Sequence, residues 1–259
     1  MIKNMFRAAA QRALLSSYFR RQLGWWGYRI VPSEQLWSPY IRNLRSVLDR
    51  YDIQGVIDVG ANIGQFGSLL RGIGYKHWIV SFEPVRALFD ELSKRAQGDN
   101  YWRCYCMALG DENKEKDIIV AEHAVFTSFL PGTEYSIEVF GDDPRPSRTE
   151  NVLLRRLDEQ FPSFRNLSER WMLKLDTQGY DLKVLEGAMS SLPGISVLQT
   201  ELSVRPIYFG MPSYREVLER LISLEYEISD LAAVNYDRQR RAIEFDCLLV
   251  RTGDFMRVA

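Results

Sequence analysis

A short segment, residues 56–66, combines an acidic side chain, small residues and the beginning of a helical pattern. Asp58 lies near the end of an apolar run, and Gly60, Ala61 and Gly64 come directly after that run. Small residues let a ligand approach the backbone closely, and the start of a helix has N–H groups without a partner inside the helix. The segment therefore predicts a strand, a tight turn and a helix that together bind a small molecule. Apolar residues recur after the turn with helical spacing, at Ile63, Phe66, Leu70 and Ile73.

The spacing of the glycines separates two cofactors that commonly occupy such a turn. A dinucleotide site uses the spacing G-x-G-x-x-G, whereas the glycines here stand at 60, 64 and 67. An acid two residues before the first glycine also suits an ammonium or sulfonium group better than a diphosphate. We interpret the turn as a cradle for S-adenosylmethionine, which carries both of those cationic groups. The alternative is an ordinary turn between a strand and a helix.

A second acid, Glu83, follows the next predicted strand, residues 77–82, and precedes Pro84. An acid at this strand end is placed to accept hydrogen bonds from both ribose hydroxyls of the cofactor. An acid that only stabilises the N-terminus of the following helix is the alternative. We favour ribose binding because the small-residue turn lies upstream. At the third strand end, Ala108 and Asp111 are expected to border the adenine, with Asp111 as a partner for its amino group.

Charged side chains also mark the ends of two later predicted strands, residues 171–176 and 195–202. Lys174 and Asp176 share one face of the first, and Glu201 stands at the equivalent height of the second. Asp176 and Glu201 are therefore expected to face the transferring methyl group. The alternative is that Lys174 simply neutralises both acids.

His123 is the histidine that could reach this site, because it precedes a long predicted loop, residues 127–150. Its unperturbed pKa suits general base catalysis near neutral pH. A lone histidine is more often a bystander, so Asp176 and Glu201 remain the other candidates for the base. His77 stands at the start of its strand, the wrong end for this chemistry. Two carboxylates are too few to infer a metal ion, and none is assigned.

Strands and helices alternate along the chain, which predicts an α/β protein with a parallel, doubly wound sheet. Two strands in a row at the C-terminus imply an antiparallel pair. The long loop breaks the alternation, and loops of this length are often functional lids. The expected helices cover residues 39–51, 64–74, 84–97, 181–192 and 213–224. The expected strands cover 54–59, 77–82, 101–108, 117–121, 152–157, 171–176, 195–202, 226–231 and 245–250, with a polar turn at 111–116.

The composition excludes several classes of protein. The 259 residues include 33 basic and 34 acidic side chains, so the chain shows no overall footprint of nucleic-acid binding. Three cysteines without metal-binding spacing indicate neither a disulfide scaffold nor a metal site. No apolar run is long enough to span a bilayer, and no signal peptide is recognisable. We therefore expect a cytoplasmic protein, and the sequence indicates no particular oligomeric state.

The N-terminal residues 1–24 are basic and amphipathic, which predicts a helix. Such a helix could lie on an anionic membrane surface, as a peripheral contact, or pack its apolar side on the rest of the protein. We favour packing, because apolar helix faces are usually part of a core. The expected organisation is an N-terminal extension, residues 1–50, followed by one domain, residues 51–259.

Four blocks of this sequence together resemble the FkbM family of methyltransferases. They are VIDVGANIG (56–64), FEP (82–84), KLDTQGYD (174–181) with LEGA (185–188), and QTEL (199–202). The resemblance implies a Rossmann-like, class I methyltransferase fold with a seven-stranded, mostly parallel sheet whose last strand is antiparallel. It spans roughly residues 54–231. Many family members carry Glu where this chain has Gln178.

The resemblance also implies methylation of a hydroxyl on a sugar or a polyketide-like natural product, and the basic N-terminus suggests a lipid-linked glycan. An N- or carboxyl-methyltransferase, a nicotinamide oxidoreductase and a non-catalytic nucleotide-binding protein are the alternatives. The acceptor side is assigned Asp176, Glu201 and His123. The cofactor side is assigned Asp58, Gly60, Ala61, Asn62, Gly64, Phe66, Glu83, Ala108, Asp111 and Asp176.

Overall fold

The computed structural model describes residues 38–141 and 144–253. The chain divides into two units, residues 1–42 and residues 43–259. Of the first unit only residues 38–42 are described, and they include the start of helix α2 (Pro39–Arg50). The amphipathic segment 1–24 lies outside the described residues. None of the described helices is long and apolar enough to cross a lipid bilayer.

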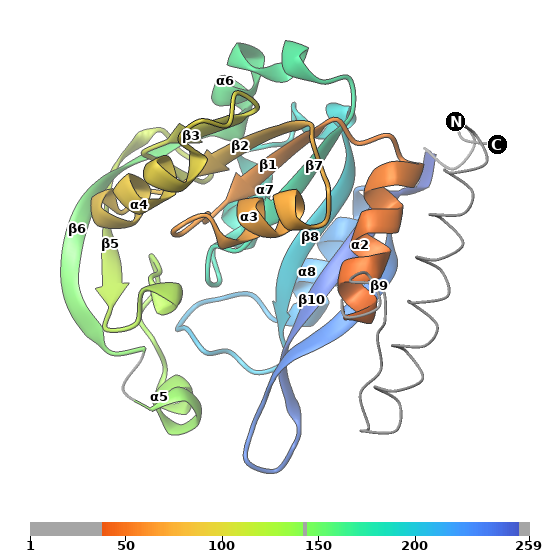
Figure 1. The fold of residues 1–259 in the computed structure, drawn as a ribbon. Helices are drawn as coiled ribbons and strands as arrows, with labels where there is room; N and C mark the ends of the chain where they lie inside the picture. Colours follow the sequence, from red (N-terminus) through yellow and green to blue (C-terminus); the bar gives the residue numbers. More distant parts are fainter. Residues whose placement is uncertain (1–37, 142–143, 254–259) are drawn as a thin grey trace, which may run out of the picture. The chain divides into compact units, whose positions relative to one another are not determined.

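A seven-stranded sheet forms the centre of the second unit, in the order β3-β2-β1-β7-β8-β10-β9 (Figure 1). β10 is antiparallel to both of its neighbours, and the other pairs in the sheet are parallel. The expected α/β class and the antiparallel last strand are therefore confirmed. The bounds are β1 (Gly55–Val59), β2 (Trp78–Phe82), β3 (Trp102–Tyr105), β7 (Trp171–Leu175), β8 (Ile195–Ser203), β9 (Tyr226–Tyr236) and β10 (Ala242–Arg251).

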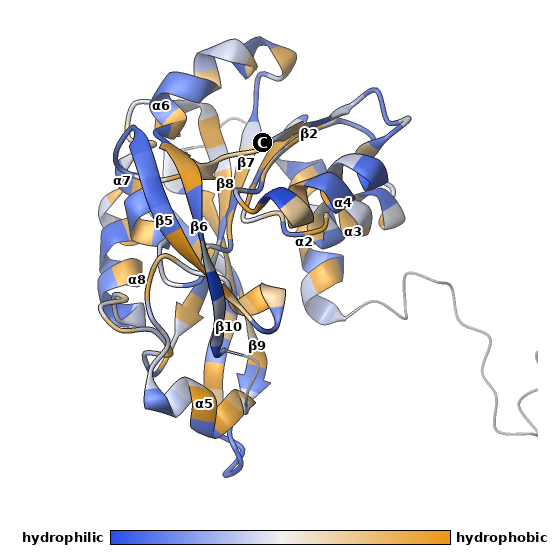
Figure 2. Cartoon of the chain, turned by 90° about the vertical axis from the view of Figure 1, so that its left-hand side faces the viewer, coloured by the Kyte–Doolittle hydropathy of each residue, from blue (hydrophilic) through white to orange (hydrophobic). Residues whose placement is uncertain are grey.

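Helices cover both faces of this sheet, α3 and α4 on one face and α7 and α8 on the other (Figures 1 and 2). All five residues of β1 and of β7 are buried, as expected for parallel strands that are covered on both sides. Figure 2 shows hydrophobic residues concentrated in β7 and β8. The helices are α3 (Gln65–Gly72), α4 (Arg86–Ala96), α5 (Glu134–Phe140), α6 (Leu157–Gln160), α7 (Asp181–Glu186) and α8 (Tyr214–Ser223), with short 3-10 helices at Ala124–Phe126, Phe161–Ser163, Arg165–Leu167 and Leu192–Gly194.

A second, three-stranded sheet contains the two expected strands 117–121 and 152–157 and extends them into the segments predicted as a turn and a loop. It has the order β4-β6-β5, formed by β4 (Ala108–Leu109), β5 (Lys114–Ala121) and β6 (Pro146–Arg155). The expected loop 127–150 is therefore wrong in part, because it contains α5 and the first residues of β6. Most of the side chains in this half of β6 are exposed and polar, so they leave no apolar alternation to detect. The expected strand 101–108 likewise divides between β3 and β4.

Candidate active site

Lys174 is the centre of a buried cluster of charges at the carboxyl ends of β1 and β7. Its Nζ lies 3.2 Å from Asp58 Oδ1 and 3.1 Å from Asp176 Oδ2. Asp58 is fully buried, and its Oδ2 also accepts a hydrogen bond from Ser81 Oγ at 3.1 Å. Burial alone lowers the pKa of Lys174, but the carboxylates of Asp176 and Asp58 outweigh it and raise that pKa above its ordinary value. Lys174 therefore neutralises two carboxylates, of which only Asp176 reaches the surface.

This cluster changes the role expected for Asp58. We expected its carboxylate to face the ammonium of a bound cofactor. In the structure that carboxylate is already used by Lys174 and Ser81, and none of its surface is exposed. Taking Asp58 away from Lys174 would leave a buried charge without its partner, which is costly. Asp58 therefore stabilises the site indirectly, through its ion pair with Lys174, which in turn binds Asp176.

The turn after β1 is shaped by close packing within the protein. Gly60 has φ +74°, and a Cβ atom at this position would fall on the carbonyl oxygen of Asp176. Hydrogen bonds already engage the N–H group of every residue from Gly60 to Gly64. These hydrogen bonds concern the turn alone, because α3 begins at Gln65, so the expectation that N–H groups at the start of the helix are free for a ligand stays a prediction. The glycine is required because β7 ends directly against the turn.

Glu83 faces the same turn from the end of β2. Its Oε2 accepts a hydrogen bond from the N–H of Asn62 at 2.8 Å, and its Oε1 accepts one from the N–H of Val85 at 2.9 Å. Burial raises the pKa of Glu83 to about 7, although both hydrogen bonds favour the ionised form. The two carboxyl oxygens can each accept a further hydrogen bond. The structure thus places this acid against both the turn and the start of α4, whose N-cap residue is Val85, so ribose binding and stabilisation of the helix N-terminus both stay predictions.

The two acids predicted for the acceptor side are joined by a residue that the sequence analysis did not assign. Gln178 Nε2 donates to Asp176 Oδ1 and to Glu201 Oε2, each at 3.0 Å. Burial, followed by the charge of Asp176, raises the pKa of Glu201 well above its ordinary value. Asp176 has an ion pair with Lys174, whereas Glu201 has no ion pair among the described residues. The two carboxyl groups are therefore adjacent, but among the described residues only that of Asp176 is paired with a cation.

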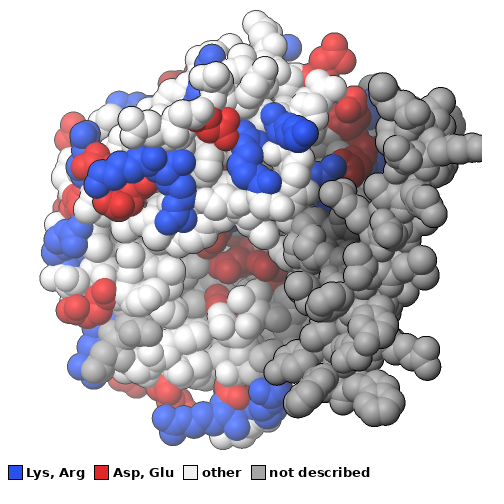
Figure 3. Space-filling view, viewed as in Figure 1, with Lys and Arg blue, Asp and Glu red and all other residues white. Residues whose placement is uncertain are grey.

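A third acid, Asp246, belongs to the same site. It lies directly opposite Glu201 in the antiparallel pair of β8 and β10, which places both side chains on one face of the sheet. Burial raises the pKa of Asp246 to about 6. Figure 3 shows Asp and Glu side chains in a recess near β7 and β8. Sequence reasoning missed Asp246 because the register of the last strand depends on the tertiary structure.

The other predicted residues lie around this centre. The ring of Phe66 is 5.4 Å from Lys174 Nζ. Ala108 is buried in an apolar cluster with residues of β5 and β6. Asp111 forms an ion pair with Lys183 at 3.0 Å, a partner that an adenine amino group would have to share. His123 is exposed, and its ring packs against that of Phe126, so no described contact brings it to Asp176 and Glu201.

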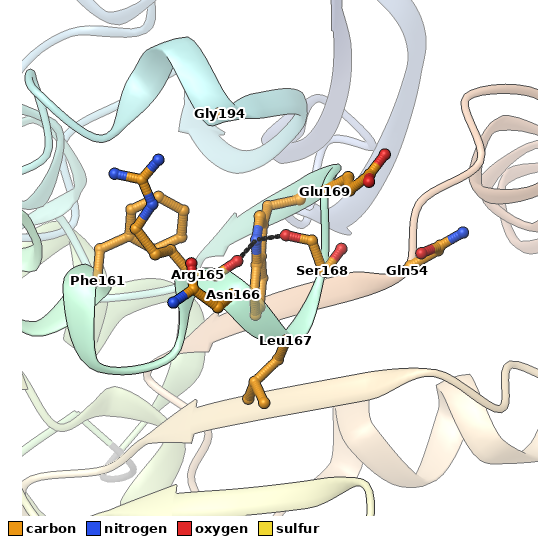
Figure 4. Close-up of a pocket in the computed structure, with 9 residues that line it drawn as sticks. Gln54, Phe161, Arg165, Asn166, Leu167, Ser168, Glu169 and Gly194 are labelled. Atoms are coloured by element: carbon orange, nitrogen blue, oxygen red, sulfur yellow. Dashed lines mark hydrogen bonds between the residues drawn. The ribbon is translucent and has the colours of Figure 1, made fainter.

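A separate hollow lies at the opposite ends of the strands from Lys174 (Figure 4). It has a volume of about 700 Å³ and adjoins the amino ends of β1, β7 and β8, where Gln54, Trp171 and Gly194 line it. In doubly wound sheets ligands bind at the carboxyl ends of the strands. This hollow is therefore not the cofactor site. The described residues also contain no group of three or more His, Cys, Asp or Glu side chains arranged to hold a metal ion.

The fold and the site together define a class of protein. A seven-stranded sheet with one antiparallel strand, a glycine turn after β1 and an acid after β2 are the features expected of a class I methyltransferase fold. Residues 58–228, more than half of the chain, match the methyltransferase FkbM domain. The chain therefore belongs to this family of S-adenosylmethionine-dependent methyltransferases.

Similar solved structures are distant in sequence. An rRNA methylase from Streptococcus thermophilus has 13% identity over 81% of this chain and 96% of that chain, with a TM-score of 0.44. Aeropyrum pernix fibrillarin in complex with S-adenosyl-L-methionine has 13% identity over 76% and 66%, with a TM-score of 0.42. Magnesium protoporphyrin IX methyltransferase from Synechocystis PCC 6803 has 9% identity over 83% and 85%, with a TM-score of 0.41. No curated protein matches the chain significantly.

Proposed function

We propose that this protein transfers a methyl group from S-adenosylmethionine to a hydroxyl group of a sugar, a glycan or a polyketide-like natural product. The position of Asp176 carries the proposal. Its backbone packs against Gly60 of the turn, and its side chain is linked through Gln178 to Glu201. A pair of carboxyl groups beside a cofactor turn suits an acceptor that loses a proton as it is methylated.

The residues around the turn fit the cofactor. When it is bound, S-adenosylmethionine supplies an electrophilic methyl group on a cationic sulfur. Glu83 is held against the turn by the N–H of Asn62, and it accepts hydrogen bonds from the ribose hydroxyls. Asp176 is the carboxylate available to the ammonium group, because its side chain is 36% exposed whereas that of Asp58 is fully buried. The methionine part of the cofactor is bordered by Gly60, Ala61, Asn62, Gly64 and Phe66. Its adenine is bordered by Ala108 and Asp111.

The acceptor side needs a group that removes the hydroxyl proton. Glu201 is suited to this role, because Asp176 is already paired with Lys174, while the hydrogen bond that Glu201 receives from Gln178 comes from a neutral group. The raised pKa of Glu201 makes its ionised form a stronger base once it forms. Lys174 and Gln178 fix Asp176 and Glu201 in place, and this fixed geometry lowers the entropic cost of aligning the reactants.

The N-terminal residues support a more specific acceptor. Residues 1–24 are basic and amphipathic, as expected of a segment that binds an anionic membrane surface. We propose that it brings the enzyme to a lipid-linked glycan at the inner face of the membrane. Sedimentation of the full chain with phosphatidylglycerol liposomes, but not with phosphatidylcholine liposomes, would support this. No sedimentation with either would reject it.

Two measurements test the proposed function. Isothermal titration calorimetry should show binding of S-adenosylhomocysteine, and a thermal shift should appear with that ligand and not with NAD. Incubation with S-adenosyl-[methyl-³H]methionine and a panel of sugars, lipid-linked glycans, amines and carboxylic acids should label a hydroxyl compound. Binding of NAD alone would reject the cofactor, and labelling of an amine or an acid alone would reject O-methylation.

A further inference from the structure

The side-chain amide of Gln178 is held in one orientation. Its Nε2 donates to Asp176 and Glu201, and its Oε1 accepts a hydrogen bond from the hydroxyl of Tyr208 at 2.8 Å. If the amide were rotated by 180°, its oxygen would face the carboxylate of Asp176, which is paired with Lys174, and both groups would be acceptors. The hydrogen-bond chemistry therefore favours the arrangement with the NH₂ group toward the acids.

The backbone of Gln178 is strained at this position. Its φ is +52°, in the left-handed region that non-glycine residues rarely adopt, and the following residue, Gly179, has φ +88°. A side chain at such a position costs about 1 kcal/mol relative to glycine. Two consecutive left-handed residues turn the chain sharply between β7 and α7. The side-chain amide of Gln178 lies between Asp176, which follows β7, and Glu201 of β8.

Two segments distant in the sequence, residues 126–133 and 206–211, hold this turn from outside, and we call them the flanking segments. They pair with each other through an antiparallel bridge between Gly132 and Tyr208. Ser128 Oγ donates to the carbonyl oxygen of Gln178 at 2.7 Å, and Tyr208, which is 2% exposed, reaches its side chain. Gln178 is therefore attached to both flanking segments, to one through its backbone carbonyl and to the other through its side-chain amide, and the amide also binds both acids.

We propose that Gln178 is a positioning residue for the methyl transfer: its amide, oriented by Tyr208, holds Glu201 as the proton acceptor beside Asp176. This inference rests on the proposed function and names a role within the same site. It explains how Asp176 and Glu201 can lie side by side although Lys174 forms its ion pair with only Asp176 of the two. A neutral donor binds both carboxylates without adding another negative charge, which Glu at this position would do.

The electrostatic consequence can be measured without an acceptor. Four acids on three neighbouring parts of the chain act on Glu201: Asp176 after β7, Asp181 at the start of α7, and Glu244 and Asp246 on β10. The hydrogen bond from Gln178 favours its ionised form. Removing this donor should therefore raise the pH at which Glu201 ionises, and adding a carboxylate should raise it further.

The experiment uses the full chain with ¹³C-labelled glutamate side chains, and E201Q identifies the signal of Glu201. We expect Q178M to raise the titration midpoint by about one pH unit, Q178E to raise it by more, and Y208F to raise it by less. Y226F is the matched control, because Tyr226 is 1% exposed and donates to a backbone carbonyl, that of Ile195, at the opposite end of β8. It should leave the midpoint unchanged.

An unchanged midpoint in Q178M and Q178E would overturn the proposal, as would an equal shift in Y226F. If neither Gln178 variant folds, Y208F decides alone, because it removes one hydroxyl and leaves the amide in place. Failure of the wild type to bind S-adenosylhomocysteine would reject the proposed function, while the midpoints would still report on the network. With a labelled acceptor, kcat of Q178M should fall at least about tenfold while KM for the cofactor stays within about threefold.

Discussion

Gly60 and Asp176 are in direct backbone contact, although 115 residues separate them in the chain. The carbonyl oxygen of Asp176 occupies the place that a Cβ atom on Gly60 would need. The N–H of Asp176 donates a hydrogen bond to the carbonyl oxygen of Val59, the residue before Gly60, at 3.1 Å. The turn after β1 and the backbone of Asp176 are therefore packed together as one unit. A displacement of either backbone must displace the other.

The first prediction concerns this contact. G60A should lose at least about 2 kcal/mol of unfolding free energy, because alanine meets a backbone atom and is strained at φ +74°. Binding of S-adenosylhomocysteine should weaken at least about tenfold. G72A is the matched control, because a Cβ atom there meets nothing within 4 Å, and this helical site should gain about 0.5–1 kcal/mol. Urea denaturation and calorimetry measure both effects. Equal stability of G60A and wild type would contradict the prediction.

The second prediction concerns the buried ion pair of Lys174 and Asp58. K174M should destabilise the protein by about 3–5 kcal/mol, because it leaves the carboxylate of Asp58 buried without a cation. The double variant D58N/K174M should recover much of this loss, since it removes both charges. Urea denaturation measures the free energies. A double variant less stable than K174M would show that the lysine acts mainly by packing.

The third prediction separates the candidates for the base. E201Q should lower kcat at least about 100-fold with little change in cofactor affinity, because an amide cannot accept the hydroxyl proton. H123A should stay within about threefold of the wild type, because His123 is exposed and its described contact is with Phe126. Incorporation of labelled methyl groups into the acceptor found in the panel measures both variants. Loss of activity in H123A and full activity in E201Q would reverse the roles.

The fourth prediction is a pH dependence caused by Glu83. Its pKa rises from an ordinary value of 4.5 in the unfolded chain to about 7 in the folded protein, because the carboxyl group is buried. The folded state therefore binds the proton more tightly, so the stability that this group contributes is present below pH 4.5 and is lost as the pH rises through 7. The pKa difference corresponds to about 3 kcal/mol.

E83Q does not titrate and provides the comparison. The unfolding free energy of the wild type minus that of E83Q should fall by up to about 3 kcal/mol between pH 4.5 and pH 8. Urea denaturation at a series of pH values measures this difference. A difference that is constant or increases with pH would show that the carboxyl group of Glu83 is not disfavoured by burial.

The sequence by itself determined the local parts of the site. The strand–turn–helix around Gly60, the acid after β2 and the charged residues at the ends of β7 and β8 are all visible as short patterns, because each depends on neighbours within a few residues. The alternation of strands and helices likewise indicated a parallel sheet. These features follow from the period of apolar residues and from the conformational freedom of glycine.

The tertiary structure alone decided how these parts interact. Asp58 is buried and forms an ion pair with Lys174, so it does not face a ligand. Gly60 is required because the chain at the end of β7 packs against it. The register of β10 brought Asp246 beside Glu201, and a left-handed turn placed Gln178 between two acids. The sequence predicted the apolar parts of β5 and β6, in the expected strands 117–121 and 152–157, but missed the polar residues 114–116 and 146–151, because they carry little apolar periodicity. Desolvation and pairing between distant segments depend on the folded arrangement, and no local pattern encodes them.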